Sequence, residues 1–162
     1  MPSSNQFSIR PINKKDHNLL KIVYSQAIED QKSSVYTPEQ IQVWSDKVWL
    51  PNLFDRVFDL GHGWIILDSE KIVSFVVRHP LNRVALLYTL GSYSRKGHAT
   101  RLLKQIETDA TIEGHKRLFT EASLISYPLF LRLGWEVVSP ESIKIAGVCF
   151  KRYRMQKLLI KS

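Results

Sequence analysis

Three apolar stretches joined by very short polar links restrict the fold of this chain more than any other feature. The stretches cover residues 64–67, 72–77 and 84–89, and they are rich in the β-branched and aromatic residues that favour strands. A parallel connection needs a crossover of about a dozen residues or more, for which the links 68–71 and 78–83 are too short. We therefore expect three adjacent antiparallel strands.

Two helices are expected ahead of these strands. A short alternating strand at 7–10 is followed by Asp16, which has the position of an N-cap because apolar residues at helical spacing come directly after it. Thr37 and Gln40 then form a capping box around a proline, which predicts the start of a second helix. Residues 49–63 carry no pattern that assigns their structure.

Helices and strands alternate in the second half of the chain. The expected elements are a helix from residue 99 to near Gly114, a strand at 118–122, a helix at 127–133, a strand at 135–138, and a hairpin of 142–145 and 148–155 that turns at Ala146-Gly147. This order predicts an α+β fold, a mixed β-sheet flanked by helices. The length of 162 residues suits a single domain over 1–162, with 1–6 as a disordered tail.

The sequence shows no sign of a membrane-spanning or secretory segment. Its longest apolar runs are far shorter than the roughly 20 residues that cross a bilayer. Residues 1–6 lack the basic start and the apolar run of a secretory leader. We therefore expect a cytoplasmic protein with no membrane partner.

The net charge of the chain favours an anionic partner. There are 23 Lys and Arg against 15 Asp and Glu, which gives a formal net charge of +8. Nucleic acid, an acidic protein and a phosphorylated cofactor all fit this charge. The five histidines and the single Cys149 show no metal-ligand spacing, so no metal is expected and the cysteine is predicted to be a buried thiol.

The sharpest local motif lies where the third apolar strand leads into the next helix. Gly97 and Ala99 are small enough for a ligand to approach the backbone, and the first amides of a helix lack internal acceptors at the positive end of its dipole. Arg95 and Lys96 add positive charge at this helix start, which an anionic ligand would explain. The amides of 95–100 are therefore a candidate pyrophosphate site, although such a motif alone also fits an ordinary strand-to-helix turn.

Longer stretches of the chain resemble a known family. Residues 87–103 are similar to motif A of the GNAT (Gcn5-related) N-acetyltransferases, in which Gln/Arg-x-x-Gly-x-Gly/Ala binds the coenzyme A pyrophosphate. Residues 121–123 and 127–136 resemble motif B, and segments 36–40 and 145–155 resemble a bacterial branch of the family. The resemblance implies a GNAT-like acyl-CoA N-acyltransferase fold, with acetyl-CoA as the co-substrate.

The resemblance also assigns site residues. The cofactor-binding residues that it implies are Leu87, Tyr88, Thr89, Ser94, Arg95, Lys96, Gly97, His98, Ala99, Thr100, Ser126 and Phe130. The chain departs from the family pattern at Ser94, which replaces Gln or Arg, and at Ser123, where many members have Asn. Phe130 stands where many members have the tyrosine that protonates the departing thiolate. Tyr127, on the same face of the predicted helix, is therefore the candidate acid, with water as the alternative.

Glu121 and three aromatic residues are candidates for the acceptor side of the site. Glu121 could relay a proton from the acceptor amine, although the sequence favours an exposed carboxylate beside Arg117. Tyr36, Trp44 and Trp49 either line a pocket for a small organic amine or belong to the core.

Together, the motifs predict an N-acetyltransferase that moves an acetyl group from acetyl-CoA to a primary amine of a small molecule, by direct attack through a tetrahedral intermediate. The alternatives are a non-catalytic module that binds coenzyme A or nucleic acid, and a protein or peptide N-acetyltransferase. No zinc spacing or aromatic-basic motif supports nucleic acid, so it is not an expected partner. The expected partners are acetyl-CoA and a small-molecule amine acceptor, and a homodimer is left open.

Overall fold

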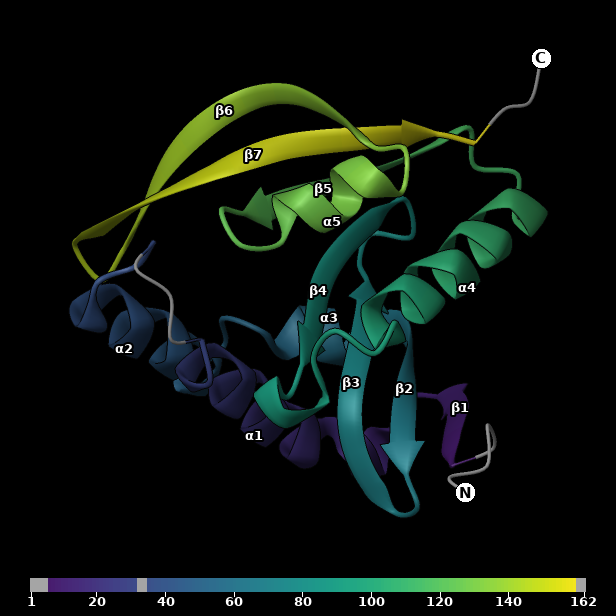
Figure 1. Ribbon diagram of the computed structural model, residues 1–162, viewed down its shortest axis with the longest axis horizontal. Coiled ribbons are helices and arrows are strands. Elements are labelled where there is room, and N and C mark those ends of the chain that lie inside the picture. Colours follow the sequence, from purple (N-terminus) through teal and green to yellow (C-terminus); the bar gives the residue numbers. More distant parts are fainter. Residues whose placement is uncertain (1–5, 32–34, 160–162) are drawn as a thin grey trace.

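The computed structural model describes residues 6–31 and 35–159, which form a seven-stranded mixed sheet with helices packed against it (Figure 1). The strands are β1 (Phe7–Pro11), β2 (His62–Asp68), β3 (Lys71–Arg78), β4 (Arg83–Thr89), β5 (Arg117–Ser123), β6 (Glu136–Ile145) and β7 (Val148–Leu158). The α-helices are α1 (His17–Glu29), α2 (Pro38–Asp46), α3 (Asp55–Leu60), α4 (His98–Ile112) and α5 (Tyr127–Arg132). Short 3-10 turns are η1 (Lys14–Asp16), η2 (Lys47–Trp49) and η3 (Gly91–Tyr93). The expected α+β fold class is confirmed.

The strands lie in the order β1-β2-β3-β4-β5-β7-β6. β1 to β4 are antiparallel neighbours, as the short links predict for β2, β3 and β4. β4 and β5 are parallel, because α4 forms the crossover between them. β7 and β6 extend the sheet as an antiparallel hairpin that arches over one end of the molecule (Figure 1).

Helices cover both faces of the central strands. β3 is buried along its whole length after Lys71, which is the pattern of a strand with packing on both sides. Tyr24 of α1 packs edge-on against Tyr88 of β4 with ring centroids 4.7 Å apart. Trp64 of β2 points to the other face, where its indole donates a hydrogen bond to Asp109 of α4. α1 and α4 therefore enclose the core from opposite sides of the sheet.

The helix starts near the N-terminus follow local capping chemistry. The Gln40 amide donates to Thr37 Oγ1 (3.1 Å) and the Thr37 amide donates to Gln40 Oε1 (2.8 Å), which is the predicted capping box. Asp16 is the N-cap residue of α1, as predicted, but its side chain makes no cap hydrogen bond to that helix. Its carboxylate accepts instead from the Asn13 amide (2.8 Å) and from the Arg10 guanidinium (2.9 Å), because the η1 turn ahead of α1 has a capping box of its own.

The ends of the chain differ in part from expectation. Residues 1–5 of the predicted tail lie outside the described residues, whereas Gln6 donates a hydrogen bond to Asp68 (3.3 Å). The predicted strand at 135–138 and the first arm of the hairpin are one strand, β6. Alternation along β7 buries Phe150 and exposes Cys149, so the prediction of a buried thiol is wrong.

An ion pair fixes the C-terminal end of α4 to the sheet. Arg78, the last residue of β3, is 3% exposed and donates to Glu113 Oε2 at 2.6 Å and to the Leu81 carbonyl at 2.8 Å. The hydrogen bond from Arg78 holds the pKa of Glu113 below its ordinary value. We expect Glu113→Gln to lower the free energy of unfolding by about 2 kcal/mol, because a buried guanidinium then loses its counter-charge.

Urea unfolding at neutral pH measures this loss, and Glu70→Gln in the exposed turn between β2 and β3 is the control. Because the pKa of Glu113 is lowered in the folded state, its stabilisation is complete above the ordinary pKa and disappears as the pH falls through the lower, folded-state pKa. The difference between wild type and variant should therefore shrink in acid. A Glu113→Gln variant as stable as wild type at neutral pH would show that the pair does not hold α4.

Candidate functional site

The parallel pair of β4 and β5 is short and then opens. The two strands pair at Arg83 and Val84, opposite Phe119 and Thr120. Beyond Val84, β4 has no strand neighbour on its β5 side among the described residues, although its other edge stays paired with β3. Since backbone polar groups point to alternate edges of a strand, part of the backbone of residues 85–89 faces this opening unpaired.

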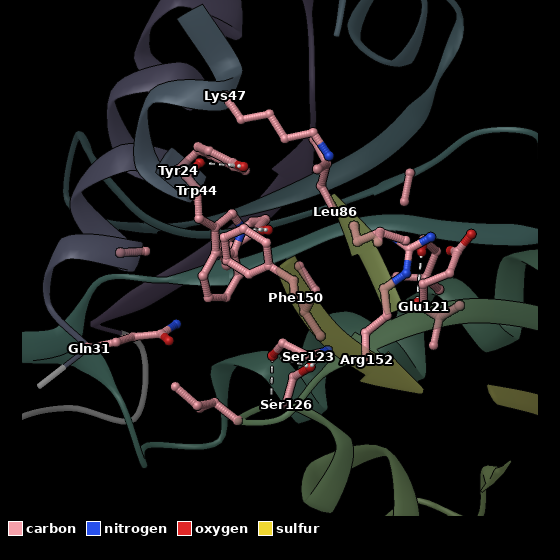
Figure 2. A pocket seen from close by; sticks show the side chains of 18 of the residues that line it. Tyr24, Gln31, Trp44, Lys47, Leu86, Glu121, Ser123, Ser126, Phe150 and Arg152 are labelled. Atoms are coloured by element: carbon pink, nitrogen blue, oxygen red, sulfur yellow. Dashed lines mark hydrogen bonds between the residues drawn. The ribbon is translucent and has the colours of Figure 1, made fainter. Parts of the chain in front are cut away.

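A pocket of about 220 Å³ lies at the opening (Figure 2). Its lining includes the predicted site residues Leu87, Tyr88, Thr89, Glu121, Ser126 and Phe130. Tyr36 and Trp44 also line it, as an acceptor pocket would require. Trp49 does not, because its indole is turned to Ser25 Oγ and the residue is 52% exposed.

Aromatic rings form one wall of the pocket. Tyr36 stands edge-on to Trp44 with centroids 5.3 Å apart, and the Trp44 indole donates to the Tyr88 hydroxyl at 3.3 Å. Burial raises the pKa of Tyr88 to about 12, so its phenol is neutral at neutral pH. Such a wall suits a small organic ligand.

Glu121 lies on the pocket wall in an ion pair. Arg83 Nε donates to Glu121 Oε2 at 2.9 Å, and both side chains are only partly exposed. The expectation of an exposed carboxylate beside Arg117 is therefore wrong. Arg117 is the first residue of β5 and donates to Gln156 Oε1 at 3.4 Å. It lies on the same face of the strand as Glu121, but four residues of extended chain separate the two by about 13 Å.

Lys47 and Arg152 bring further positive charge to the pocket (Figure 2). Lys47 begins η2, directly after α2, and its ammonium lies 5.6 Å from the centre of the Phe54 ring. Burial lowers the pKa of Lys47, and the neighbouring guanidinium groups of Arg152 and Arg83 lower it further.

Neither Lys47 nor Arg152 is among the residues predicted from the sequence. Lys47 follows Trp44 at helical spacing, and Arg152 follows Phe150 at strand spacing, so each shares a face with a residue of the pocket wall. These two periodicities are the signal that could have found them.

Hydroxyl groups gather where β5 ends. The Oγ atoms of Ser123 and Ser126 are 3.0 Å apart in a hydrogen bond, and the Leu124 amide donates to the Tyr36 hydroxyl at 2.9 Å. Burial raises the pKa of Tyr36, so its phenol keeps its proton at neutral pH. The hydroxyl lies beside the Ser123 side chain on the pocket wall, where its proton is within reach of a ligand in the pocket.

Phe130 reaches the pocket but Tyr127 does not. Phe130 is 2% exposed and packs edge-on against Trp135 with centroids 5.0 Å apart. Tyr127, at the start of the same helix, packs its ring against Tyr153 of β7 at 4.7 Å and is absent from the pocket lining.

The predicted phosphate motif forms the start of α4, outside the pocket lining. Gly97 is the N-cap in a left-handed conformation (φ 84°), and Arg95 is left-handed as well (φ 61°). Apart from chain neighbours, no described atom lies within 4 Å of the point where a Cβ on Gly97 would stand. The amides of 95–100 make no hydrogen bond within the described part of the chain, and the first helical bond runs from the Arg101 amide to the Gly97 carbonyl (3.0 Å).

The side chains of this motif are used in different ways. Ser94 Oγ donates to the Gly91 carbonyl at 2.7 Å, and Lys96 Nζ lies 5.4 Å from the centre of the Tyr93 ring. His98 is buried against Phe7, and burial lowers its pKa, so the ring is neutral at neutral pH. His98 therefore anchors the start of α4 on β1. Arg95 is exposed, Ala99 and Thr100 are half-buried in the first turn of α4, and none of their amides has a partner within the described part of the chain.

Neither a metal-binding cluster nor a membrane-spanning helix is found in the described ranges, residues 6–31 and 35–159. Within them no cluster of His, Cys, Asp and Glu could hold a metal ion. No helix there is long and apolar enough to cross a bilayer.

The comparison with protein families decides which enzymes this site belongs with. The model of the acetyltransferase (GNAT) domain matches residues 32–157, most of the chain. The chain belongs to the GNAT family. It is therefore an acetyl-CoA-dependent N-acetyltransferase, and the resemblance noted in the sequence is confirmed.

Individual relatives of this GNAT chain agree with the assignment. The uncharacterized N-acetyltransferase YafP of Escherichia coli K12 is 24% identical over 155 residues, which cover 94% of this chain and 96% of that protein. The crystal structure of a GCN5-related N-acetyltransferase from Rhodopseudomonas palustris superposes with a TM-score of 0.87 at 20% identity, covering 93% of this chain and 94% of the other. The PaiA N-acetyltransferase of Thermoplasma acidophilum, solved with coenzyme A, gives 0.70 at 16% identity, covering 94% and 98%.

Proposed function

We propose that this GNAT enzyme transfers the acetyl group of acetyl-CoA to a primary amine of a small molecule by direct attack. The observation that carries the proposal is the small aromatic-walled pocket at the point where β4 and β5 separate. A cavity of about 220 Å³ suits a small acceptor better than a folded protein surface.

The cofactor is proposed to bind along β4 and the start of α4. Those backbone groups of residues 87–89 (Leu87, Tyr88 and Thr89) that face the opening would take the amides of the pantetheine arm, since extended ligands pair with free strand edges. The pyrophosphate would lie on the amides of 95–100, which have no partner in the described chain and stand at the positive end of the α4 dipole. Arg95 and Lys96 add charge of the right sign.

The chemistry needs no covalent enzyme intermediate. The neutral amine attacks the thioester carbonyl, a tetrahedral oxyanion forms, and its collapse breaks the carbon–sulfur bond to release the coenzyme A thiolate. A free amide of β4 would stabilise the oxyanion. The amine loses a proton on becoming an amide, and the carboxylate of Glu121 on the pocket wall is the proposed acceptor, directly or through a water molecule.

Protonation of the leaving thiolate requires a donor in place of the phenol that Phe130 lacks. Tyr36 fits this role, because its hydroxyl lies beside Ser123 and Leu124 on the pocket wall and keeps its proton at neutral pH. Tyr127, the candidate from the sequence, remains the alternative although its ring packs on Tyr153.

Turnover on a panel of amines tests the proposed function. Purified protein with acetyl-CoA should release free thiol faster with some small primary amines than without an acceptor, and mass spectrometry should find the N-acetylated amine. Peptides and denatured proteins serve as the comparison arm. Binding of acetyl-CoA without amine-dependent thiol release would support the non-catalytic alternative, and turnover confined to peptides would support a protein acetyltransferase.

A further inference from the structure

We propose that Lys47 selects acceptors that carry an anionic group, a carboxylate or a phosphate, close to the reacting amine. This inference rests on the proposed function, because it names the class of amine that the same pocket takes.

Lys47 is the half-buried cation of the pocket that has no ion-pair partner among the described residues, whereas Lys151, which also lines the pocket without an ion pair, is exposed. The Lys47 ammonium lies over the Phe54 ring, and the residue is half-buried at the junction of α2 and η2. In Figure 2 the ammonium points into the cavity rather than to the outside of α2.

Both guanidinium groups of the pocket are already paired. Arg83 binds Glu121 at 2.9 Å, and Arg152 binds Glu141. Figure 2 shows Arg152 extending from the wall opposite Lys47, with its guanidinium turned toward Glu121. The lining therefore holds the cations Lys47, Arg83, Lys151 and Arg152 against the single carboxylate of Glu121. This imbalance favours a ligand that brings negative charge.

The free-energy cost of burying the Lys47 ammonium without an ion pair also favours an anionic ligand. An ammonium that is partly removed from water and forms no ion pair is disfavoured unless a ligand supplies one. The lowered pKa of Lys47 reflects that cost: burial is its largest cause, the guanidinium groups of Arg152 and Arg83 come next, and the smaller attraction of the Glu121 carboxylate opposes them. A ligand carboxylate or phosphate would supply the missing counter-charge through a charge-assisted hydrogen bond.

The competing explanation is that Lys47 only covers the Phe54 ring. A methionine keeps most of the unbranched stem and the contact with Phe54 but removes the charge, so Lys47→Met separates the two explanations. Lys144→Met is the matched control, because Lys144 is exposed and lies between Ile143 and Ile145 on β6, whose side chains face the pocket.

The test compares amines in pairs that differ only in the anionic group. The pairs are amino acids against their carboxamides, and phosphoethanolamine against ethanolamine. We expect the wild type to favour the anionic member of at least one pair by about tenfold in kcat/KM, the size expected for one charge-assisted hydrogen bond. Lys47→Met should abolish that preference through KM for the amine, whereas Lys47→Arg and Lys144→Met should keep it. Which pair shows the preference distinguishes carboxylate from phosphate.

Calorimetry makes the test independent of turnover. N-acetylated products of the same pairs are titrated into the protein saturated with coenzyme A. The anionic product of a pair should bind the wild type more tightly than the neutral product does, whereas both products should bind Lys47→Met equally. Equal binding and equal kcat/KM within every pair, or a preference that survives in Lys47→Met, would overturn the inference. If no amine turns over while Lys47-dependent binding of anions persists, the proposed function fails and the role of Lys47 stands.

Discussion

Replacement of Gly97 by valine is expected to weaken acetyl-CoA binding at least about a hundredfold. The open space above Gly97 is where the pyrophosphate would approach the amides of 95–100, and an isopropyl group would fill it. Loss of two charge-assisted hydrogen bonds, at about 1.5 kcal/mol each, already gives this factor. Titration calorimetry with acetyl-CoA measures the change.

A matched control separates this effect from backbone strain. Gly97 has φ 84° and Gly114, beyond the other end of α4, has φ 85°, and neither position has a described atom within 4 Å of an added Cβ. Valine at either site should therefore cost a similar 1–2 kcal/mol for the left-handed conformation, roughly a few degrees in Tm. Only Gly97→Val should lose the cofactor. Equal acetyl-CoA affinity in two folded variants would remove this turn from the binding site.

Features fixed by neighbouring residues were predictable from the sequence. The capping box of Thr37 and Gln40 joins groups three positions apart, and the short links forced β2, β3 and β4 to be antiparallel. Asp16 shows the limit of such reasoning. Its position marks a helix start, but its carboxylate bonds to Arg10 and to the Asn13 amide of the η1 turn, a turn that the sequence pattern does not reveal.

The candidate site also combines a part that neighbouring residues determine with a part that only the fold brings together. The turn at 94–100 is a continuous segment, so its small residues and charges could be recognised in the sequence. Lys47, Arg83 and Arg152 come from three separate elements, and only the fold shows that their charges meet in one pocket. The partner of Glu121 was misassigned for this reason, because Arg117 is near in sequence while Arg83 is near across the β4–β5 pair.

Phe130 lacks the phenol that would protonate the leaving thiolate, and we expect Tyr36 to supply it. Tyr36→Phe should therefore lower kcat by about a hundredfold, which is the lower limit for general acid catalysis. The Tyr36 hydroxyl accepts from the Leu124 amide at 2.9 Å and keeps its own proton, so it can donate to the thiolate that leaves at the end of β5. Because a proton donor acts mainly in the transition state, acetyl-CoA affinity should change little.

Tyr127→Phe is the comparison variant, and we expect it to retain most of the wild-type kcat because its ring packs on Tyr153 away from the cavity. The kcat of both variants is measured at saturating amine, and single-turnover kinetics establish that chemistry limits the rate. The Tm of each variant is measured as well, because Tyr36→Phe leaves the Leu124 amide without its acceptor and can lower the stability of the fold. A Tyr36→Phe effect on KM for the amine alone would make Tyr36 part of the acceptor wall. A fall in kcat in Tyr127→Phe instead would assign the acid to α5, and an unchanged kcat in both would leave water as the proton donor, since a thiolate is already a tolerable leaving group.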